Sequence, residues 1–354
     1  MAPTIVIAAG GTAGHVVPAL AVADALRAEG ARVVFVGGER AERTMVPAAG
    51  YELRPIAVEG LSRSNPLKAA RAAGRAALAV RTARAILRDV RPDAVLGAGG
   101  YVAGPVGLAA VVGRVPMVLA EADSHLGLTN RLLARCARRV CLAFPIAGRD
   151  GDRYLVTGRA VPPPATDRAA ARARFGLDES ATCVLVFGGS LGARSINEAA
   201  VDGLAGAEFR VLHACGTRDY AALRERLGPE PPANYDLREF ITPFGDAILA
   251  SDLCVARAGG SIFEIAAHGR PAILVPYPYA SADHQSSNAR WMVQAGAAVV
   301  VPDAELGPER LADEVAALLA DPARLEAMGR ASAALARPDA AQRIAAEVLA
   351  AAAG

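Results

Sequence analysis

Residues 257–288, RAGGSIFEIAAHGRPAILVPYPYASADHQSSN, combine a glycine turn, a short helix, an apolar strand and a polar loop. Ser261 is a candidate N-cap for this helix, and Glu264 lies in its first turn. The apolar strand 271–275 is typical of a buried parallel sheet. Polar side chains follow the strand, at Asp283, His284, Gln285 and Asn288. The stretch predicts a nucleotide site at the carboxyl edge of a parallel sheet, although an ordinary strand–helix unit with a glycine turn shares this outline.

The same alternation of strands and helices extends over the rest of the chain. Strands are expected at 4–9, 33–36, 51–58, 93–96, 117–119 and 140–142, with a long helical stretch over 65–91. After a proline-rich segment they resume at 182–187, 209–213, 236–240, 253–256, 272–275 and 298–301, and a helical tail starts at 308. Alternation without hairpin signals predicts an α/β fold with parallel sheets.

The proline-rich segment divides the chain into similar halves. We expect Rossmann-like domains at 1–157 and 167–354, joined by a linker at 158–166, with the active site in the cleft between them. An alternative for the last helix is that it packs back on the N-terminal domain. The helix after the first strand is expected from about Pro18 to Glu29.

Composition excludes several classes of protein. The net charge of +2 over 354 residues is too close to neutral to argue for nucleic-acid binding. The five cysteines are scattered without a CxxC pair, so neither disulfides nor a zinc site is expected. The start, MAPTIVIAAGG, has no basic residue before its short apolar run, so no signal peptide is expected. The uncharged stretch 94–113 is rich in glycine and contains Pro105, which favours a strand, a loop and a short helix over a membrane span.

Glycine loops occur at 10–15, 97–104 and 188–193, each between a strand and a helix. Their backbone N–H groups can bind phosphate oxygens, so the loops predict two phosphorylated ligands or one long one. Each loop taken singly is equally consistent with a plain turn. The first loop reads GGxxG and lacks both the GxGxxG fingerprint and the ending of a P-loop, so a nicotinamide-dependent enzyme is the least favoured alternative.

His15 ends the first glycine loop. An imidazole of near-neutral pKa could take a proton from a sugar hydroxyl, which makes His15 a candidate general base; a helix-capping histidine is the alternative.

Several motifs together resemble one family, the MurG-type UDP-GlcNAc transferases of peptidoglycan synthesis. They are GGTAGHVVPALAVADAL, GAGGYVAGPVGLAA, GLTNRLLA, GGSLGARSIN and the block EIAAHGRPAILVPYPYASADHQSSNAR, followed by the AGAA of 295–298. The likeness covers nearly the whole chain in the expected order. It implies the GT-B architecture, in which two Rossmann-like domains face a cleft, and the substrates UDP-GlcNAc and lipid I.

The resemblance also implies roles for residues. Glu264 would bind the ribose, Gln285 would face the sugar, and Ser190 would touch the diphosphate. Ile241 would meet the uracil through its backbone. Positions near the GlcNAc would be Thr12, Ala13, Gly14 and Asp123. The diphosphate of lipid I would be received by Gly10, Gly11, Gly99, Gly100 and Tyr101. His15 matches a residue proposed to help catalysis, and Glu121 is a second candidate for the base.

The sequence departs from the family pattern at three positions near these motifs. Asp123 stands where Asn is usual, Leu191 replaces a Gln, and Pro162 stands where an Arg is expected. Arg159 is close to that last position but not equivalent to it. The loop 257–264 is also one residue shorter than in many members. These departures affect the expected donor contacts more than the expected reaction.

The expected reaction is an inverting transfer, in which the C4 hydroxyl of the muramoyl unit of lipid I displaces UDP from GlcNAc, giving lipid II. No DxD-like pair stands out as a metal site, so we expect neither a metal nor another cofactor, and turnover that survives EDTA. Alternatives are another GT-B lipid glycosyltransferase, such as a diacylglycerol type, and a non-catalytic UDP-sugar-binding protein.

Lipid I is held in a bilayer, so the protein must reach a membrane surface. Residues 60–91 carry one acid, Asp89, among apolar residues and eight basic ones: Arg63, Lys68, Arg71, Arg75, Arg81, Arg84, Arg88 and Arg91. Such a stretch suits an anionic membrane, and a solvated helix face is the alternative. We expect a peripheral protein on the cytoplasmic face of the cell membrane.

Overall fold

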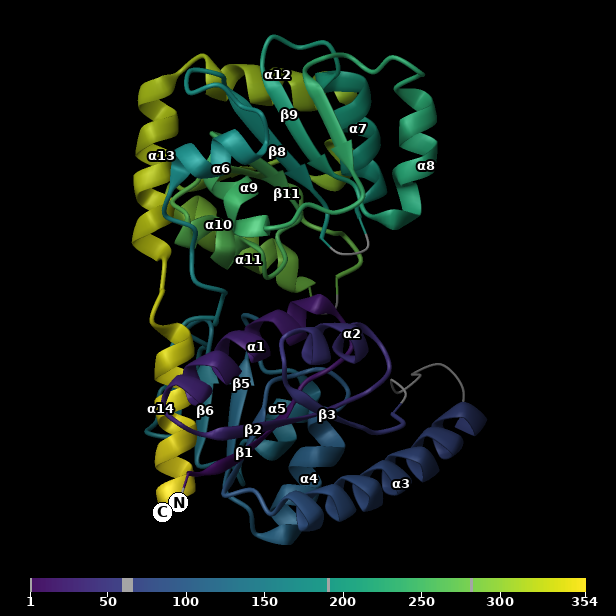
Figure 1. Cartoon of the computed structure of the whole chain (residues 1–354), viewed down its shortest axis with the longest axis vertical. Coiled ribbons are helices and arrows are strands. Elements are labelled where there is room, and N and C mark those ends of the chain that lie inside the picture. The colour runs from purple at the N-terminus through teal and green to yellow at the C-terminus, as the bar shows by residue number, and fades with distance from the viewer. Residues whose placement is uncertain (1, 59–65, 190–191, 281–282) are drawn as a thin grey trace. The chain divides into compact units, whose positions relative to one another are not determined.

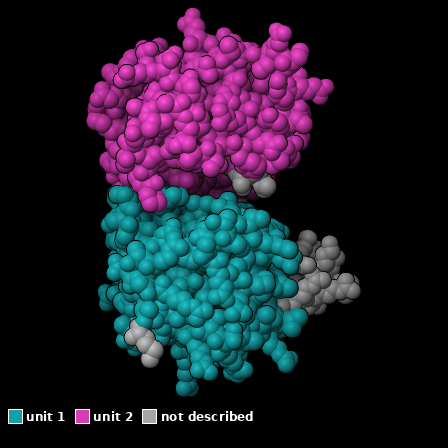
Figure 2. Space-filling view, in the orientation of Figure 1, with its two compact units in different colours: residues 1–162, 337–354 teal, residues 163–336 magenta. Residues whose placement is uncertain are grey.

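A computed structural model describes the chain except residues 1, 59–65, 190–191 and 281–282, and leaves the side chains of 66–76 undescribed (Figure 1). The chain forms two compact units (Figure 2). Unit 1 comprises Met1–Pro162 and Arg337–Gly354, and unit 2 comprises Pro163–Ala336. The division falls inside the proline-rich segment, but the end of the chain, including its last helix, belongs to unit 1.

Unit 1 contains a seven-stranded sheet in the order β3-β2-β1-β4-β5-β6-β7, with every neighbouring pair parallel. Its strands are β1 Thr4–Ala8, β2 Arg32–Gly37, β3 Glu52–Pro55, β4 Ala94–Gly97, β5 Met117–Glu121, β6 Arg139–Leu142 and β7 Tyr154–Val156. Its helices are α1 Ala13–Ala28, α2 Ala41–Ala48, α3 Pro66–Val90, α4 Ala103–Gly113, α5 Leu128–Leu133 and α14 Ala340–Ala353.

Unit 2 contains a six-stranded sheet in the order β10-β9-β8-β11-β12-β13, also parallel throughout. The strands are β8 Cys183–Phe187, β9 Arg210–Ala214, β10 Tyr235–Arg238, β11 Leu253–Ala256, β12 Ala272–Leu274 and β13 Ala298–Val300. The helices are α6 Arg168–Arg174, α7 Arg194–Leu204, α8 Thr217–Arg226, α9 Phe244–Ala250, α10 Ile262–Ala267, α11 His284–Gln294, α12 Pro308–Leu319 and α13 Pro322–Leu335; a 3-10 turn spans Asp303–Glu305.

Each unit has its own core. The central strands β1 and β8 are almost entirely buried, as expected for apolar strands covered by helices on both faces. In unit 1, α14 packs on α1, β4 and β5, and its residues Ile344, Val348 and Ala351 join the core beside Val22. The expected α/β fold with two Rossmann-like sheets is confirmed. None of the described helices is long and apolar enough to cross a membrane.

Several elements differ from the expected ones. β7, three residues at the edge of the sheet, was not expected. α1 begins at Ala13 instead of near Pro18, so His15 lies in its first turn and the first loop is shorter. α11 begins at His284, so Gln285 and Asn288 lie on a helix and not in a loop. The contacts that hold the first turns of these two helices are described below.

Candidate active site

The two glycine loops of unit 1 are in direct contact. Gly99 and Gly100 have φ of +98° and +75°, which favour glycine. A Cβ on Gly100 would lie 2.0 Å from the carbonyl oxygen of Gly10, so no larger residue is tolerated without a shift of the backbone. The structure therefore brings together the residues expected at the acceptor diphosphate: Gly10, Gly11, Gly99, Gly100 and Tyr101.

Glu42 holds this loop pair, and sequence analysis missed it. Its carboxylate has no exposed surface and accepts hydrogen bonds from the backbone N–H of Gly11 at 2.9 Å and of Gly38 at 2.8 Å. The Tyr101 hydroxyl donates to it at 3.2 Å. Burial by itself would raise the pKa of Glu42, but these backbone hydrogen bonds outweigh it and lower the pKa. The one sequence signal for Glu42 was its position, as an acid in the first turn of the helix after the second strand.

His15 stands between the two loops. A Cβ on Gly99 would lie 2.9 Å from its Nδ1, and this buried nitrogen has no hydrogen-bond partner among the described residues. Burial, followed by the positive charge of Arg159, lowers the pKa of His15, while Asp123 and Glu42 oppose the shift. The imidazole is therefore neutral at neutral pH, which a general base requires.

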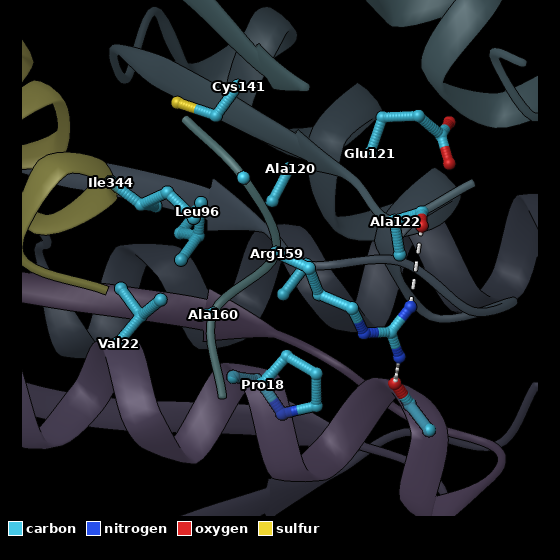
Figure 3. A pocket seen from close by; sticks show the side chains of 14 residues that line it. Pro18, Val22, Leu96, Ala120, Glu121, Ala122, Cys141, Arg159, Ala160 and Ile344 are labelled. Atoms are coloured by element: carbon cyan, nitrogen blue, oxygen red, sulfur yellow. Dashed lines mark hydrogen bonds between the residues drawn. The ribbon is translucent and has the colours of Figure 1, made fainter. Parts of the chain in front are cut away.

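Arg159 supports the helix start that carries His15. Pro18 has no N–H to donate to the carbonyl of Gly14, four residues earlier in α1. The Arg159 guanidinium donates to that carbonyl and, at 3.4 Å, to the carbonyl of Ala122 (Figure 3). A side chain from after β7 thus connects the first turn of α1 to the loop after β5. Sequence analysis noticed Arg159 but gave it no role.

Residues Thr12, Ala13 and Gly14, expected near the GlcNAc, form this helix start. Thr12 is the N-cap residue and makes no side-chain cap hydrogen bond. The first N–H groups of a helix have no intrahelical acceptor, so those of α1 can meet an anion or a hydroxyl.

Glu121 ends β5 and is almost fully buried. Its Oε2 accepts from the backbone N–H of Gly127 at 2.8 Å and the Asn130 amide at 3.0 Å, and its Oε1 accepts from the N–H of Asp123 at 3.1 Å. Burial raises the pKa of Glu121, although these hydrogen bonds oppose the rise. Both oxygens are occupied by holding residues 122–127, which favours a positioning role for Glu121 over that of a base.

A small cavity of about 30 Å³ lies behind this region in unit 1 (Figure 3). Its lining is mainly apolar and includes Val22, Leu96, Cys141 and Ile344, with Arg159 at one side.

In unit 2, the described part of the third glycine loop is tightly folded. Gly189 and Gly192 have φ of +89° and +72°, and the N–H of Gly192 donates to the carbonyl of Gly189 at 3.0 Å. A Cβ on Gly192 would lie 2.1 Å from the carbonyl oxygen of Cys215, so this loop packs against the turn after β9. Ser190 and Leu191 lie outside the described residues.

Gln285 and Asn288, on α11, brace the neighbouring loops. The N–H of Tyr277 donates to Gln285 Oε1 at 2.9 Å, so the amide N–H₂ of Gln285 remains as a donor for a ligand. Asn288 Nδ2 donates to the carbonyl of Ala258 at 3.0 Å. These contacts hold α11 against the loops after β11 and β12.

Arg257 ties three segments of unit 2 together. Its guanidinium donates to Asp303 Oδ1 at 2.5 Å, to Ser195 Oγ at 2.8 Å and to the carbonyl of Val275 at 3.1 Å. It also lies over the ring of Tyr277, 5.4 Å from the centroid. The glycine turn after β11 is therefore fixed to the start of α7 and to the end of β12.

The remaining expected donor residues lie on the same edge of the unit 2 sheet. Glu264 is in the first turn of α10, and the buried Ile241 follows β10. Ser261 occupies the N-cap position of α10, but its backbone is helical and its hydroxyl makes no cap hydrogen bond, so the expected capping role is wrong. Within the described residues, no three His, Cys, Asp or Glu side chains gather into a group that could hold a metal ion.

Each unit therefore presents its own set of candidate residues at the carboxyl ends of its strands, where open α/β sheets bind ligands. Unit 1 brings together the residues of the first two glycine loops, His15, Glu121 and Asp123. Unit 2 carries the loop after β8, Ile241, Glu264 and Gln285 along one edge of its sheet.

Comparison with known proteins agrees with this arrangement. The N-terminal domain of glycosyltransferase family 28 matches residues 5–142, and the C-terminal domain of the same family matches residues 183–344. A UDP-N-acetylglucosamine–N-acetylmuramyl-(pentapeptide) pyrophosphoryl-undecaprenol N-acetylglucosamine transferase from Halorhodospira halophila is 42% identical, over 97% of this chain and 96% of its own. The enzyme of that name from Moorella thermoacetica is 40% identical, over 96% of each chain.

Solved structures give the same result. MurG from Acinetobacter baumannii superposes with a TM-score of 0.76 at 29% identity, over 99% of this chain and 100% of its own. A calicheamicin glycosyltransferase superposes with a TM-score of 0.69 at 21% identity, over 99% and 98%, which shows a shared fold alone. The GT-B fold and the resemblance seen in the sequence motifs are confirmed. The chain belongs to glycosyltransferase family 28 and, within it, to the MurG family of N-acetylglucosaminyltransferases.

Proposed function

We propose that this protein transfers GlcNAc from UDP-GlcNAc to the C4 hydroxyl of the MurNAc unit of lipid I, giving lipid II for peptidoglycan synthesis. The observation that carries the proposal is the meeting of two glycine loops and a neutral histidine at one sheet edge. It occurs in a chain 40–42% identical to named transferases over nearly its full length.

In the proposed reaction, the C4 oxygen of the acceptor forms a bond to the anomeric carbon of GlcNAc as the bond from that carbon to the UDP oxygen breaks. The acceptor proton passes to His15, which is neutral and beside the second glycine loop. The two electrons of the broken bond leave with UDP. Backbone N–H groups of the loop after β8 stabilise the charge that develops on the leaving diphosphate of UDP. Those of the two unit 1 loops bind the diphosphate of lipid I, whose charge does not change in the reaction.

We assign the donor to unit 2. Glu264 binds the ribose, the backbone of Ile241 meets the uracil, and the loop after β8, with Ser190, receives the diphosphate. Gln285 offers its amide N–H₂ to the sugar, since its oxygen is bound to the N–H of Tyr277. Thr12, Ala13, Gly14 and Asp123 complete the sugar site, and the loops with Gly10, Gly11, Gly99, Gly100 and Tyr101 take the acceptor diphosphate.

We further propose that unit 1 docks on an anionic membrane as a peripheral protein on the cytoplasmic face. Of the basic residues in the expected stretch, Arg81, Arg84 and Arg88 are exposed on α3. The side chains of Arg63, Lys68, Arg71 and Arg75 lie outside the described set. The helix α4, which packs on α3, exposes Leu108 and Val112, and α5, which packs on α4, exposes Leu128 and Leu132. Exposed apolar groups beside arginines are what an anionic bilayer surface binds.

Of the alternatives, a diacylglycerol glycosyltransferase would differ in acceptor, and a UDP-sugar-binding protein would not turn over. Product analysis separates them. The protein, supplied with UDP-GlcNAc and either a soluble lipid I analogue or diacylglycerol, should glycosylate only the former. NMR of the product should show a β linkage to C4 of MurNAc, the expected result of inversion. A glycosylated diacylglycerol or an α linkage would contradict the proposal.

A further inference from the structure

Three buried polar side chains of unit 2 form a hydrogen-bonded line next to the glycine loop 188–193. It begins at Tyr235 on β10, passes through His213 on β9 and ends at Asn197 on α7. The Tyr235 hydroxyl lies 2.8 Å from His213 Nδ1, and His213 Nε2 lies 3.1 Å from Asn197 Oδ1. The side chains of His213 and Asn197 have no exposed surface, and Tyr235 is almost fully buried. No step of the proposed reaction uses them.

The direction of the hydrogen bonds in this line can be worked out from its Asn197 end. Asn197 Nδ2 donates to the carbonyl of Cys215 at 2.9 Å and to Asp219 Oδ2 at 3.0 Å, and both of these groups can only accept. The Asn197 oxygen therefore faces His213 and needs a donor, which must be Nε2–H. Burial lowers the pKa of His213 to about 3, so the ring is neutral and Nδ1 accepts from the Tyr235 hydroxyl.

The Asn197 end of this line supports the glycine loop directly. The Cys215 carbonyl that accepts from Asn197 is the one against which Gly192 packs, since a Cβ on Gly192 would lie 2.1 Å from its oxygen. The same Cβ position is 3.3 Å from Asn197 Nδ2. The backbone N–H of Asn197 also donates to the carbonyl of Ala193, at 2.8 Å. Asn197 thus fixes the far end of the loop from two sides.

Asp219, which accepts from Asn197, also contacts two arginines at the same edge of the sheet. Arg218 Nε donates to Asp219 Oδ1 at 3.0 Å, and Arg194 Nε lies 3.6 Å from that oxygen. Both arginine side chains are more than half exposed. Arg194 directly follows the glycine loop, and Arg218 follows the turn that contains Cys215 and Gly216. The carboxylate keeps these guanidinium groups beside the loop while the rest of each side chain stays accessible.

We infer that Tyr235, His213 and Asn197 are positioning residues for the donor diphosphate. They fix the Cys215 carbonyl and Asp219, which in turn hold the backbone of the glycine loop and the two arginines where phosphate oxygens bind. This inference rests on the proposed function, in which the loop after β8 receives the diphosphate of UDP-GlcNAc.

Two substitutions of His213 test its hydrogen bond to Tyr235 and its hydrogen bond to Asn197 separately. His213→Gln places an amide nitrogen near the position of Nε2 and keeps a donor to Asn197. His213→Asn places an amide oxygen near the position of Nδ1, keeps an acceptor for Tyr235 and loses the donor to Asn197. Calorimetric titration of the full chain with UDP, and NMR titration with uridine, measure binding with and without the diphosphate.

We expect His213→Asn to weaken UDP binding about tenfold, the effect of one lost hydrogen bond, and to change uridine binding less than about twofold. His213→Gln should stay within about threefold of wild type for both ligands. Arg218→Met, at an exposed position, should also weaken UDP binding and leave uridine unchanged, which keeps the test available should His213→Asn not fold.

Equal UDP affinity in wild type, His213→Asn and Arg218→Met would overturn the inference. Parallel losses of UDP and uridine binding in His213→Asn would also overturn it, because the line would then only maintain the fold. A wild-type chain that binds no UDP would overturn the proposed function itself, and the inference with it.

Discussion

Arg159 donates a hydrogen bond to the backbone carbonyl of Gly14, at the first turn of α1. The two residues are 145 positions apart in the chain. The contact replaces the intrahelical hydrogen bond that Pro18 cannot make, and it brings a positive charge close to His15. It therefore links the stability of the helix start to the pKa of the proposed base.

Replacing Arg159 by Met should loosen the start of α1. The carbonyls of Gly14 and Ala122 would lose a donor, and one unsatisfied buried group costs about 1–3 kcal/mol. Hydrogen exchange of the α1 amides measures this as a lower free energy of local opening. Pro18→Ala is the matched control, because it restores an N–H for the Gly14 carbonyl. The double variant should lose less stability than Arg159→Met alone, and strictly additive effects would contradict the assignment.

The acid side of the pH–rate profile should report His15. Its pKa is lowered by burial and then by Arg159, so it lies below the ordinary value of 6.5. As pH falls through that lowered pKa, His15 becomes protonated and kcat/KM should fall. His15→Ala should reduce kcat about 10²–10⁴-fold and remove this limb, whereas Arg159→Met should shift the limb to higher pH. If the acid limb persists unchanged in His15→Ala, a residue other than His15 is the base.

The same lowered pKa affects stability. Below pH 6.5 the unfolded chain binds a proton at His15 that the folded chain does not, so the free energy of unfolding should decrease as pH falls in this range. His15→Gln should flatten that part of the stability curve. A curve of unchanged slope would show that the histidine is no more buried in the folded state than in the unfolded one.

Glu42 should matter for stability as well as for the loop pair. Glu42→Gln replaces one carboxylate oxygen by an amide nitrogen, so one of the two N–H groups of Gly11 and Gly38 loses its acceptor. This should lower the free energy of unfolding by about 1–3 kcal/mol. Because the pKa of Glu42 is lowered in the folded state, its contribution is present above about pH 4.5 and is lost as pH falls below that value. Urea denaturation at neutral and acid pH measures both effects.

Glu39 provides a control, because its side chain is exposed on the same segment before α2. Glu39→Gln should leave the free energy of unfolding within about 0.5 kcal/mol of wild type. Equal effects of the two substitutions would contradict the role given to Glu42.

Reversing the charge of Arg81, Arg84 and Arg88 to Glu should weaken binding to anionic vesicles roughly 10²-fold or more, since each basic residue contributes about 1 kcal/mol near such a surface. Leu108→Glu with Leu132→Glu should weaken binding also to neutral vesicles, because these are exposed apolar groups. The triple reversal of Arg290, Arg324 and Arg330, exposed in unit 2, is the control. Equal sedimentation of all variants with vesicles would exclude the proposed docking surface.

The fold was predictable because its signals are local. Apolar runs between glycine loops gave the strands of both sheets, and the loops themselves mark positions such as Gly100 and Gly192, where a Cβ would strike a neighbouring carbonyl. His15, Gln285 and Glu264 were found because each belongs to such a loop or to the helix beside it.

The parts that were missed depend on contacts between distant segments. Pro18 favoured a helix start at its own position, and only Arg159 explains why α1 begins earlier. Glu42 is unremarkable in sequence until Gly11, Gly38 and Tyr101 are seen around it. Asn197 and His213 likewise acquire a role only when β9, β10 and α7 are packed together.

Acceptor-dependent release of UDP from UDP-GlcNAc tests the central claim most directly. Wild-type protein should release UDP only when a soluble lipid I analogue is present, and His15→Ala should do so much more slowly at the same substrate concentrations. Release that is independent of the analogue, or no release from wild type in its presence, would contradict the assignment of lipid I as the acceptor.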